Sequence, residues 1–102
     1  MSWQAITTLD DIPLLGSRVL THPDGDIALF RPHENQVFAL RDRCPHKGGP
    51  LSQGLLVGES VVCPLHSWHI DLRSGIALPP DQGCAGHIPC KVEDGRVWLD
   101  LT

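Results

Sequence analysis

The sequence has few basic residues: eight Lys and Arg stand against twelve Asp and Glu, which gives a formal net charge of −4. Without a basic patch the chain cannot release counterions from phosphates, so we expect no nucleic-acid partner. No apolar run approaches the roughly 18 residues that cross a bilayer, and we expect no membrane partner. The N-terminal segment has no Lys or Arg before Arg18 and carries Asp10 and Asp11, whereas a secretory signal begins with basic residues. We therefore expect a cytoplasmic protein.

Several catalytic signatures are also missing from the sequence. It contains no G-x-G-x-x-G dinucleotide motif, no G-x-x-x-x-G-K-[ST] phosphate loop and no G-x-S-x-G nucleophile elbow. We therefore expect that the chain by itself binds neither NAD(P)H nor flavin nor a substrate. Internal repeats and low-complexity segments are absent as well. The 102 residues leave room for one small domain, which we place over residues 1–102.

The local sequence pattern is that of a β protein. Helical periodicity is scarce, and nine Pro and ten Gly oppose long helices. Short apolar stretches are separated by the turn segments Pro23–Asp26, Glu34–Gln36 and Asp94–Gly95. The expected antiparallel neighbours are 18–21 with 27–30, 27–30 with 37–40, and 91–93 with 96–99. This spacing predicts an all-β sandwich or barrel whose loops carry the function.

Two loops contain the residues with metal chemistry. Cys44-Pro45-His46 and, after sixteen residues, Cys63-Pro64-Leu65-His66 each offer one thiolate and one imidazole. Four such ligands could bind a single zinc or iron ion. They also suit a [2Fe–2S] cluster of the Rieske arrangement, in which two Cys bind one iron and two His bind the other. Structural zinc sites usually place the two Cys together and the two His together, so the mixed pairs favour the cluster.

The two imidazoles change the charge of such a cluster. Two Fe³⁺, two sulfides and two thiolates sum to zero when the other ligands are neutral, whereas four thiolates leave a charge of −2. An electron enters a neutral centre more easily, and Rieske potentials accordingly span roughly −150 to +300 mV, against roughly −400 mV for plant-type clusters. The ligand types therefore predict an electron carrier of raised potential.

The sequence resembles the Rieske iron–sulfur family from about Trp3 to Leu101. Within this family it is most similar to the small subunits of assimilatory NAD(P)H-dependent nitrite reductases. The segments that carry this likeness are Cys44–Ser52, Cys63–His66 with Trp68, Asp71–Gly75, Pro80–Cys84 and the hairpin Val92–Gly95. Ferredoxins that serve ring-hydroxylating dioxygenases have the same size and the same two loops, and they are the alternative.

The resemblance implies a Rieske-type antiparallel β-sandwich or barrel, with a cluster-binding subdomain formed by two loops at about residues 43–52 and 62–71. It implies that Cys44, His46, Cys63 and His66 hold the cluster, and that the chain transfers electrons without a catalytic residue of its own. The implied partner is the large flavin and sirohaem subunit that reduces nitrite to ammonia in nitrate assimilation. In the alternative, the partners are a ferredoxin reductase and an oxygenase. A zinc-stabilised interaction module is the third hypothesis.

Other positions of the loops also follow the resemblance. High-potential members of the family have an additional Cys in each loop, which form a disulfide; Gly49 and Leu65 stand at these positions here, so the disulfide cannot form. We expect Gly48 and Gly49 to let backbone N–H groups approach the cluster sulfides. The segment Pro79-Pro80 is expected to form a third loop that covers the cluster.

The remaining reactive residues have structural interpretations. Cys84 and Cys90 are expected to be small buried hydrophobes, with a disulfide or a second metal site as the less favoured alternative. We expect the other histidines at solvated turns or edges, the tryptophans in the core, and the cationic residues near the loops on a charged surface or a docking rim. These residues are His22, His33, His69 and His87; Trp3, Trp68 and Trp98; and Arg41, Arg43, Lys47 and Arg73.

Metal content tests the choice between cluster and zinc. We expect a red-brown protein that contains iron and acid-labile sulfide in equal amounts, about two of each per chain. Cys63→Ser and His46→Ala each remove one ligand and should abolish the visible spectrum, whereas Cys84→Ser should leave it intact. A colourless protein with stoichiometric zinc, from cells supplied with iron, would contradict the cluster.

Overall fold

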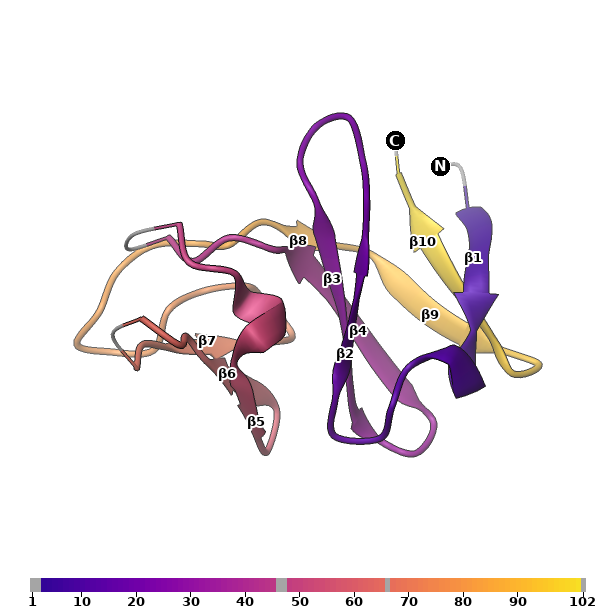
Figure 1. The fold of residues 1–102 in the computed structure, drawn as a ribbon, viewed down its shortest axis with the longest axis horizontal. Coiled ribbons are helices and arrows are strands. Elements are labelled where there is room, and N and C mark those ends of the chain that lie inside the picture. Colours follow the sequence, from indigo (N-terminus) through magenta and orange to yellow (C-terminus); the bar gives the residue numbers. More distant parts are fainter. Residues whose placement is uncertain (1–2, 46–47, 66, 102) are drawn as a thin grey trace.

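The computed structural model describes residues 3–45, 48–65 and 67–101, which form three antiparallel sheets (Figure 1). The first sheet has the order β1 (Trp3–Thr8), β10 (Arg96–Asp100), β9 (Cys90–Glu93). The second has the order β2 (Ser17–Leu20), β3 (Ile27–His33), β4 (Gln36–Arg41), β8 (His87–Ile88). The third has the order β5 (Leu55–Val57), β6 (Ser60–Val62), β7 (His69–Asp71). The predicted all-β class is therefore confirmed.

Helical structure in the described residues consists of two short 3₁₀ turns, η1 (Leu9–Asp11) and η2 (Leu51–Gln53). Neither is long or apolar enough to cross a membrane.

The hairpins predicted from turn residues are present. β2 and β3 pair across the Pro23–Asp26 turn, and β3 and β4 pair across the turn that follows His33. β9 and β10 pair across Asp94 and Gly95, which have φ values of 52° and 74°. Two successive residues with positive φ match the right-handed twist of a hairpin, which explains why Asp-Gly stands there.

Five strands, β1, β5, β6, β7 and β8, lie in segments where no strand was predicted. β1 pairs with β10 through contacts such as Trp3 with Asp100. β5, β6 and β7 have only three residues each. The second cluster loop is accordingly shorter than the expected 62–71, because β6 includes Val62 and β7 begins at His69. The turn between them spans residues 63–68.

The second sheet lies between two hydrophobic cores. Ile27 and Leu29 pack toward the first sheet, whereas Ala28 and Phe30 pack toward the third. All four are at most 1% exposed. Side chains of a strand alternate between its two faces, so a strand covered on both faces needs an uninterrupted apolar run.

Arg73, which follows β7, pairs with Glu59 and reaches the ring of Phe38 on β4. Arg73 pairs with Glu59 through two contacts, one of them Nη2 to Oε2 at 3.1 Å, and its guanidinium lies 5.3 Å from the centre of the Phe38 ring. The hydrogen bond from Arg73 lowers the pKa of Glu59, and the same bond raises the pKa of Arg73. Glu59 lies in the β5–β6 turn, at the end of β6 away from Cys63. Arg73 is exposed, so the charged surface expected for it is confirmed, although it lies away from Cys63.

Gly54 packs against the backbone that leads into the second cluster loop. A Cβ at this position would lie 2.1 Å from the carbonyl oxygen of Val62. Because backbone cannot rotate away as a side chain does, we expect Gly54→Ala to lower the free energy of unfolding by about 1–3 kcal/mol. Val57→Ala removes an exposed side chain from the adjacent strand and should change it by less than about 0.5 kcal/mol. Urea unfolding measures both, and equal midpoints would contradict the close packing of Gly54.

Candidate metal centre

Cys44 and Cys63 begin two turns with the same hydrogen bonds. The carbonyl of Cys44 accepts a bond from the N–H of Gly48 at 2.9 Å, and its own N–H donates to the carbonyl of Gly49 at 2.8 Å. In the second turn the carbonyl of Cys63 accepts a bond from the N–H of Ser67 at 3.0 Å, and the N–H of Cys63 donates to the carbonyl of Trp68 at 2.8 Å. Each thiol-bearing residue is thus fixed at both backbone polar groups.

The fourth residue after each cysteine adopts a left-handed backbone conformation. Gly48 has a φ of 74°, and Ser67 has a φ of 59°. This conformation reverses the chain and sends it back toward the cysteine, as the hydrogen bonds require. Glycine adopts it without steric cost, whereas Ser67 is a non-glycine residue in a sparsely populated region.

The two cysteines are buried, each with 2% of its surface exposed. Both belong to the core between the second and third sheets, so packing as well as hydrogen bonding holds them. A thiol pair sheltered from water and carried on two adjacent turns suits the two-cysteine half of the predicted cluster site.

Gly49 is the point of closest approach between the turns. A Cβ here would lie 2.8 Å from Cδ1 of Leu65 and 3.3 Å from Sγ of Cys63. Leu65 therefore packs directly over the glycine. These are the two positions at which the resemblance implied a disulfide in high-potential proteins, and van der Waals contact joins them here.

The other proposed ligands, His46 and His66, lie outside the described residues, as does Lys47. Within the described part of the chain, no three potential metal-binding side chains come together. The two cysteines nevertheless fit a [2Fe–2S] cluster. Gly49 has no side chain, so the first turn passes close to the second and the Cys63 thiol lies beside the turn that carries Cys44.

A third loop reaches the first turn through Gly83. A Cβ at Gly83 would lie 2.7 Å from Cβ of Pro45, and the φ of Gly83 is 135°. Close approach and conformation together require glycine here. Pro79 and Pro80 are both exposed, and the described contact of this loop with the first turn is made by Gly83.

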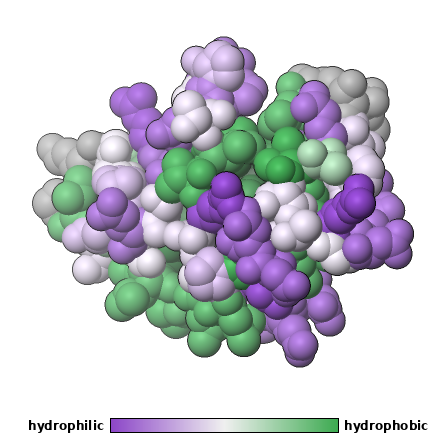
Figure 2. Space-filling model, turned by 45° about the vertical axis from the view of Figure 1, so that its right-hand side comes forward, coloured by the Kyte–Doolittle hydropathy of each residue, from purple (hydrophilic) through white to green (hydrophobic). Residues whose placement is uncertain are grey.

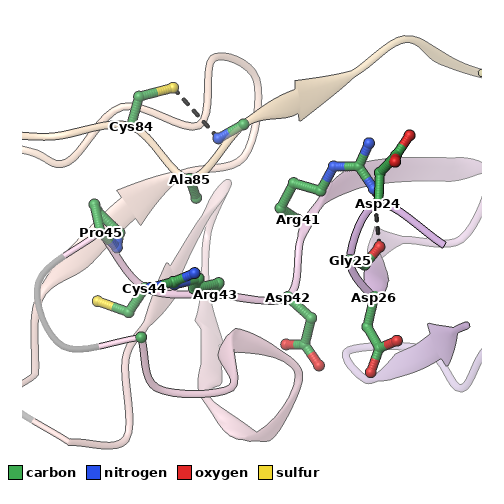
Figure 3. A pocket seen from close by; sticks show the side chains of 12 residues that line it. Asp24, Gly25, Asp26, Arg41, Asp42, Arg43, Cys44, Pro45, Cys84 and Ala85 are labelled. Carbon is green, nitrogen blue, oxygen red and sulfur yellow. Dashed lines mark hydrogen bonds between the residues drawn. The ribbon is translucent and has the colours of Figure 1, made fainter. Parts of the chain in front are cut away.

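A groove of about 910 Å³ runs beside Cys44 (Figure 3). It lies between the β2–β3 turn, the end of β4, the first cluster turn and the third loop. Arg41 crosses it and donates from Nη1 to the carbonyl of Gly25 at 2.8 Å. Arg41 and Arg43 thus lie near the first turn as expected, and their role in docking stays a prediction.

No disulfide joins the four cysteines, and Cys84 and Cys90 differ in burial. Cys84 is exposed, so the expectation of a buried residue is wrong; it lies on the third loop, where its Sγ accepts the N–H of Gly86 at 3.4 Å. Cys90 is partly buried beside the core of the first sheet. Its burial raises the pKa of the Cys90 thiol to about 12.

Some of the positions expected for the tryptophans and histidines are confirmed and others are wrong. Trp68 packs against the core near Cys63, as expected. Trp3 and Trp98 lie outside the two buried clusters, with the amine of Lys91 at 4.6 and 5.9 Å from their rings, so the core position expected for them is wrong. The expected surface positions are confirmed for the exposed histidines, which are His33, His69 and His87.

The model of the Rieske [2Fe-2S] domain matches residues 2–97 of this chain. The chain belongs to the Rieske [2Fe–2S] family. A [2Fe–2S] cluster is accordingly its cofactor, and the resemblance noted from the two loops is confirmed.

Three proteins illustrate the similarity of this Rieske protein to known ones. It is 50% identical over 85 residues to 4beta-methylsterol monooxygenase of Methylococcus capsulatus; the match covers 72% of this chain but 23% of that longer protein. It is 34% identical over 104 residues to the 3-phenylpropionate/cinnamic acid dioxygenase ferredoxin subunit of Photorhabdus laumondii, covering 100% and 97% of the two chains. The solved structure of the E. coli protein NirD superposes with a TM-score of 0.82 at 33% identity, covering 96% and 94%.

Gly49 provides a test of the contact between the turns. Gly49→Ala places a methyl group against Leu65 and the Cys63 thiol, and overpacking should lower the free energy of unfolding by about 1–3 kcal/mol. Gly49→Ala combined with Leu65→Ala should recover part of this loss, because the nearest clashing atoms are removed. Chemical unfolding of the two variants and of Leu65→Ala alone measures the coupling, and additive effects would contradict the contact.

Cys84 and Cys90 should differ in reactivity. At pH 8 the raised pKa keeps Cys90 almost wholly in its unreactive thiol form, and burial blocks access, so iodoacetamide should label Cys84 and spare Cys90. Mass spectrometry of the cluster-containing protein identifies the labelled residue, and unfolding should make Cys90 reactive. Equal labelling of both in the folded protein would contradict the structure. Dithiothreitol should leave the Tm unchanged because no disulfide joins the cysteines.

Proposed function

We propose that this Rieske protein is the electron-transfer subunit of a cytoplasmic NAD(P)H-dependent nitrite reductase, with Cys44, His46, Cys63 and His66 as ligands. The observation that carries the proposal is the pair of buried thiols on two matching turns at one end of the molecule (Figure 1). When bound, the cluster accepts and donates one electron at a time. The chain's own residues bind it and exclude water from the thiolates.

The surroundings of the turns support transfer between proteins over catalysis on a small substrate. Substrate pockets are mostly apolar and enclosed, with a few polar groups. The groove beside Cys44 is lined largely by charged residues and glycines, including Arg41, Asp42 and Arg43. The carboxylate of Asp42 is already engaged, since it accepts bonds from the N–H and the hydroxyl of Ser52 at 2.7 and 2.8 Å. An electron carrier without a substrate site needs protein partners at both ends of its cycle.

The likeness to a nitrite reductase small subunit supports the choice of partner. A solved structure described as a "putative nitrite reductase NADPH (small subunit)" superposes with a TM-score of 0.83 at 26% identity, covering 98% of this chain and 99% of that one. We therefore propose the large flavin and sirohaem subunit as the partner, which carries electrons from NAD(P)H to nitrite.

A second candidate is a ferredoxin that shuttles electrons between a reductase and a ring-hydroxylating oxygenase. It is favoured by the dioxygenase ferredoxin subunit of Photorhabdus laumondii, which matches over the full length of this chain. The two candidates differ in how the chain is held: a subunit forms a lasting complex, whereas a shuttle makes brief and weak encounters.

Association with the large subunit separates these candidates. We expect the chain, coexpressed with the large nitrite reductase subunit of the same organism, to elute with it in fixed stoichiometry on size exclusion. The complex should reduce nitrite with NAD(P)H, and Cys63→Ser should lower this activity while the complex still forms. The control is the same large subunit with an unrelated Rieske ferredoxin. A chain that elutes alone but is rapidly reduced by a ferredoxin reductase would favour the shuttle.

A further inference from the structure

The turn before β2 displays two leucines side by side. Leu14 is 54% exposed and Leu15 is 64% exposed, and among the described residues they are the one pair of exposed large apolar side chains adjacent in sequence. Figure 2 shows apolar surface along the lower edge of the molecule, an edge to which both the turn before β2 and the β5–β6 hairpin belong in Figure 1. Such surface is unfavourable in water and marks contact sites when it is clustered.

The backbone of this turn is strained where the second leucine stands. Leu15 has a φ of 61°, and the turn is closed by a bond from the N–H of Gly16 to the carbonyl of Pro13 at 2.9 Å. The left-handed conformation brings Cβ close to the following carbonyl, so glycine or asparagine is favoured there. A leucine at this position costs stability and, being exposed, gains little from burial. Strain of this kind persists where function requires the side chain.

Arg31 holds the turn in one geometry. Its carbonyl accepts the N–H of Leu15 at 2.8 Å, and its N–H donates to the carbonyl of Gly16 at 3.1 Å. Its guanidinium also donates to the carbonyls of Ile12 at 2.9 Å and Glu34 at 2.8 Å. The two leucines are therefore presented on a fixed turn, which lowers the entropy lost when they are bound.

The shape of the chain argues against a second copy as the binding partner. Two adjacent leucines on a convex turn need an apolar pocket. The groove of about 910 Å³ is lined by Asp24, Asp26, Arg41, Asp42 and Arg43 among others, and a smaller hollow of about 160 Å³ includes Arg41 and Asp100. Neither offers an apolar pocket for this turn.

Charge also disfavours contact of the turn with itself. In a two-fold dimer the two turns would face each other, with the exposed Asp10 of each chain beside them and a net charge of −4 on each chain. The occupant that fits is therefore a different protein with an apolar pocket.

We propose that the Pro13–Gly16 turn anchors this chain by inserting Leu14 and Leu15 into an apolar pocket of the large nitrite reductase subunit; this rests on the function proposed above. The turn lies before β2, away from Cys44 and Cys63, and Figure 1 places it apart from the cluster turns. The chain would then be held at one face while the end that carries the cluster faces the electron donor or acceptor.

The test uses Leu15→Asn in the cluster-containing chain, measured against the large subunit by calorimetry. Asparagine has nearly the same size and tolerates the left-handed conformation, so the Tm of the isolated chain should be equal to or above that of wild type. Affinity for the large subunit should fall about tenfold or more, as for a buried contact residue. Leu14→Asn should act in the same direction. Val57→Asn, at a position also 54% exposed but on β5, at the end of the β5–β6 hairpin away from Cys63, is the matched control and should leave affinity unchanged.

The outcomes separate this inference from the function on which it rests. If wild type binds the large subunit and Leu15→Asn binds equally well, the anchor is wrong and the nitrite reductase proposal stands. If wild type does not bind the large subunit, the proposed function fails, and the anchor fails with it. Sedimentation velocity completes the test: a dimer of the isolated chain that Leu15→Asn abolishes would assign the turn to a second copy and overturn the proposal.

Discussion

The structure depends on bringing two cysteines, nineteen positions apart in the chain, to one buried place. Each cysteine closes a short turn with both of its backbone polar groups, and the left-handed conformations of Gly48 and Ser67 make this closure possible. The third sheet holds one turn and the end of β4 holds the other. Without the backbone closure, packing alone would leave the relative position of the thiols undefined, and metal ligation requires defined positions.

Contact between the turns rests on the absence of a side chain at Gly49. Leu65 occupies the space that a Cβ at Gly49 would enter. A covalent bridge between loops would restrict them independently of the rest of the protein, whereas packing of this kind depends on the whole core beneath it. The stability of the site and the stability of the fold are therefore more closely linked here than in a bridged relative, because apart from the bonds to the cluster only noncovalent contacts oppose local opening of the turns.

The sequence predicted the features that depend on local chemistry. Asp94-Gly95 specifies its own hairpin, and the spacing of the cysteines indicates the site before any fold is known. β1, β8 and the third sheet were not predicted. The strands of the third sheet have three residues each, too few for a recognisable pattern, and β1 is stabilised by β10 from the other end of the sequence. The exposure of Cys84 and the pairing of Arg73 with Glu59 likewise depend on long-range packing. The left-handed conformation of Leu15 could not be predicted, because leucine rarely adopts it and nothing in the neighbouring sequence indicates it.

The pairing of β1 with β10 affects how this domain can be joined to other domains. Trp3 lies opposite Asp100, so the polypeptide enters and leaves the sheet at one place, and Figure 1 shows both ends on the side away from the cluster turns. Because both ends of the described chain lie away from the cluster turns, sequence added at either end need not contact the cluster site. The relative from Methylococcus capsulatus, in which the matching segment is about a quarter of a much longer polypeptide, is consistent with such modular reuse.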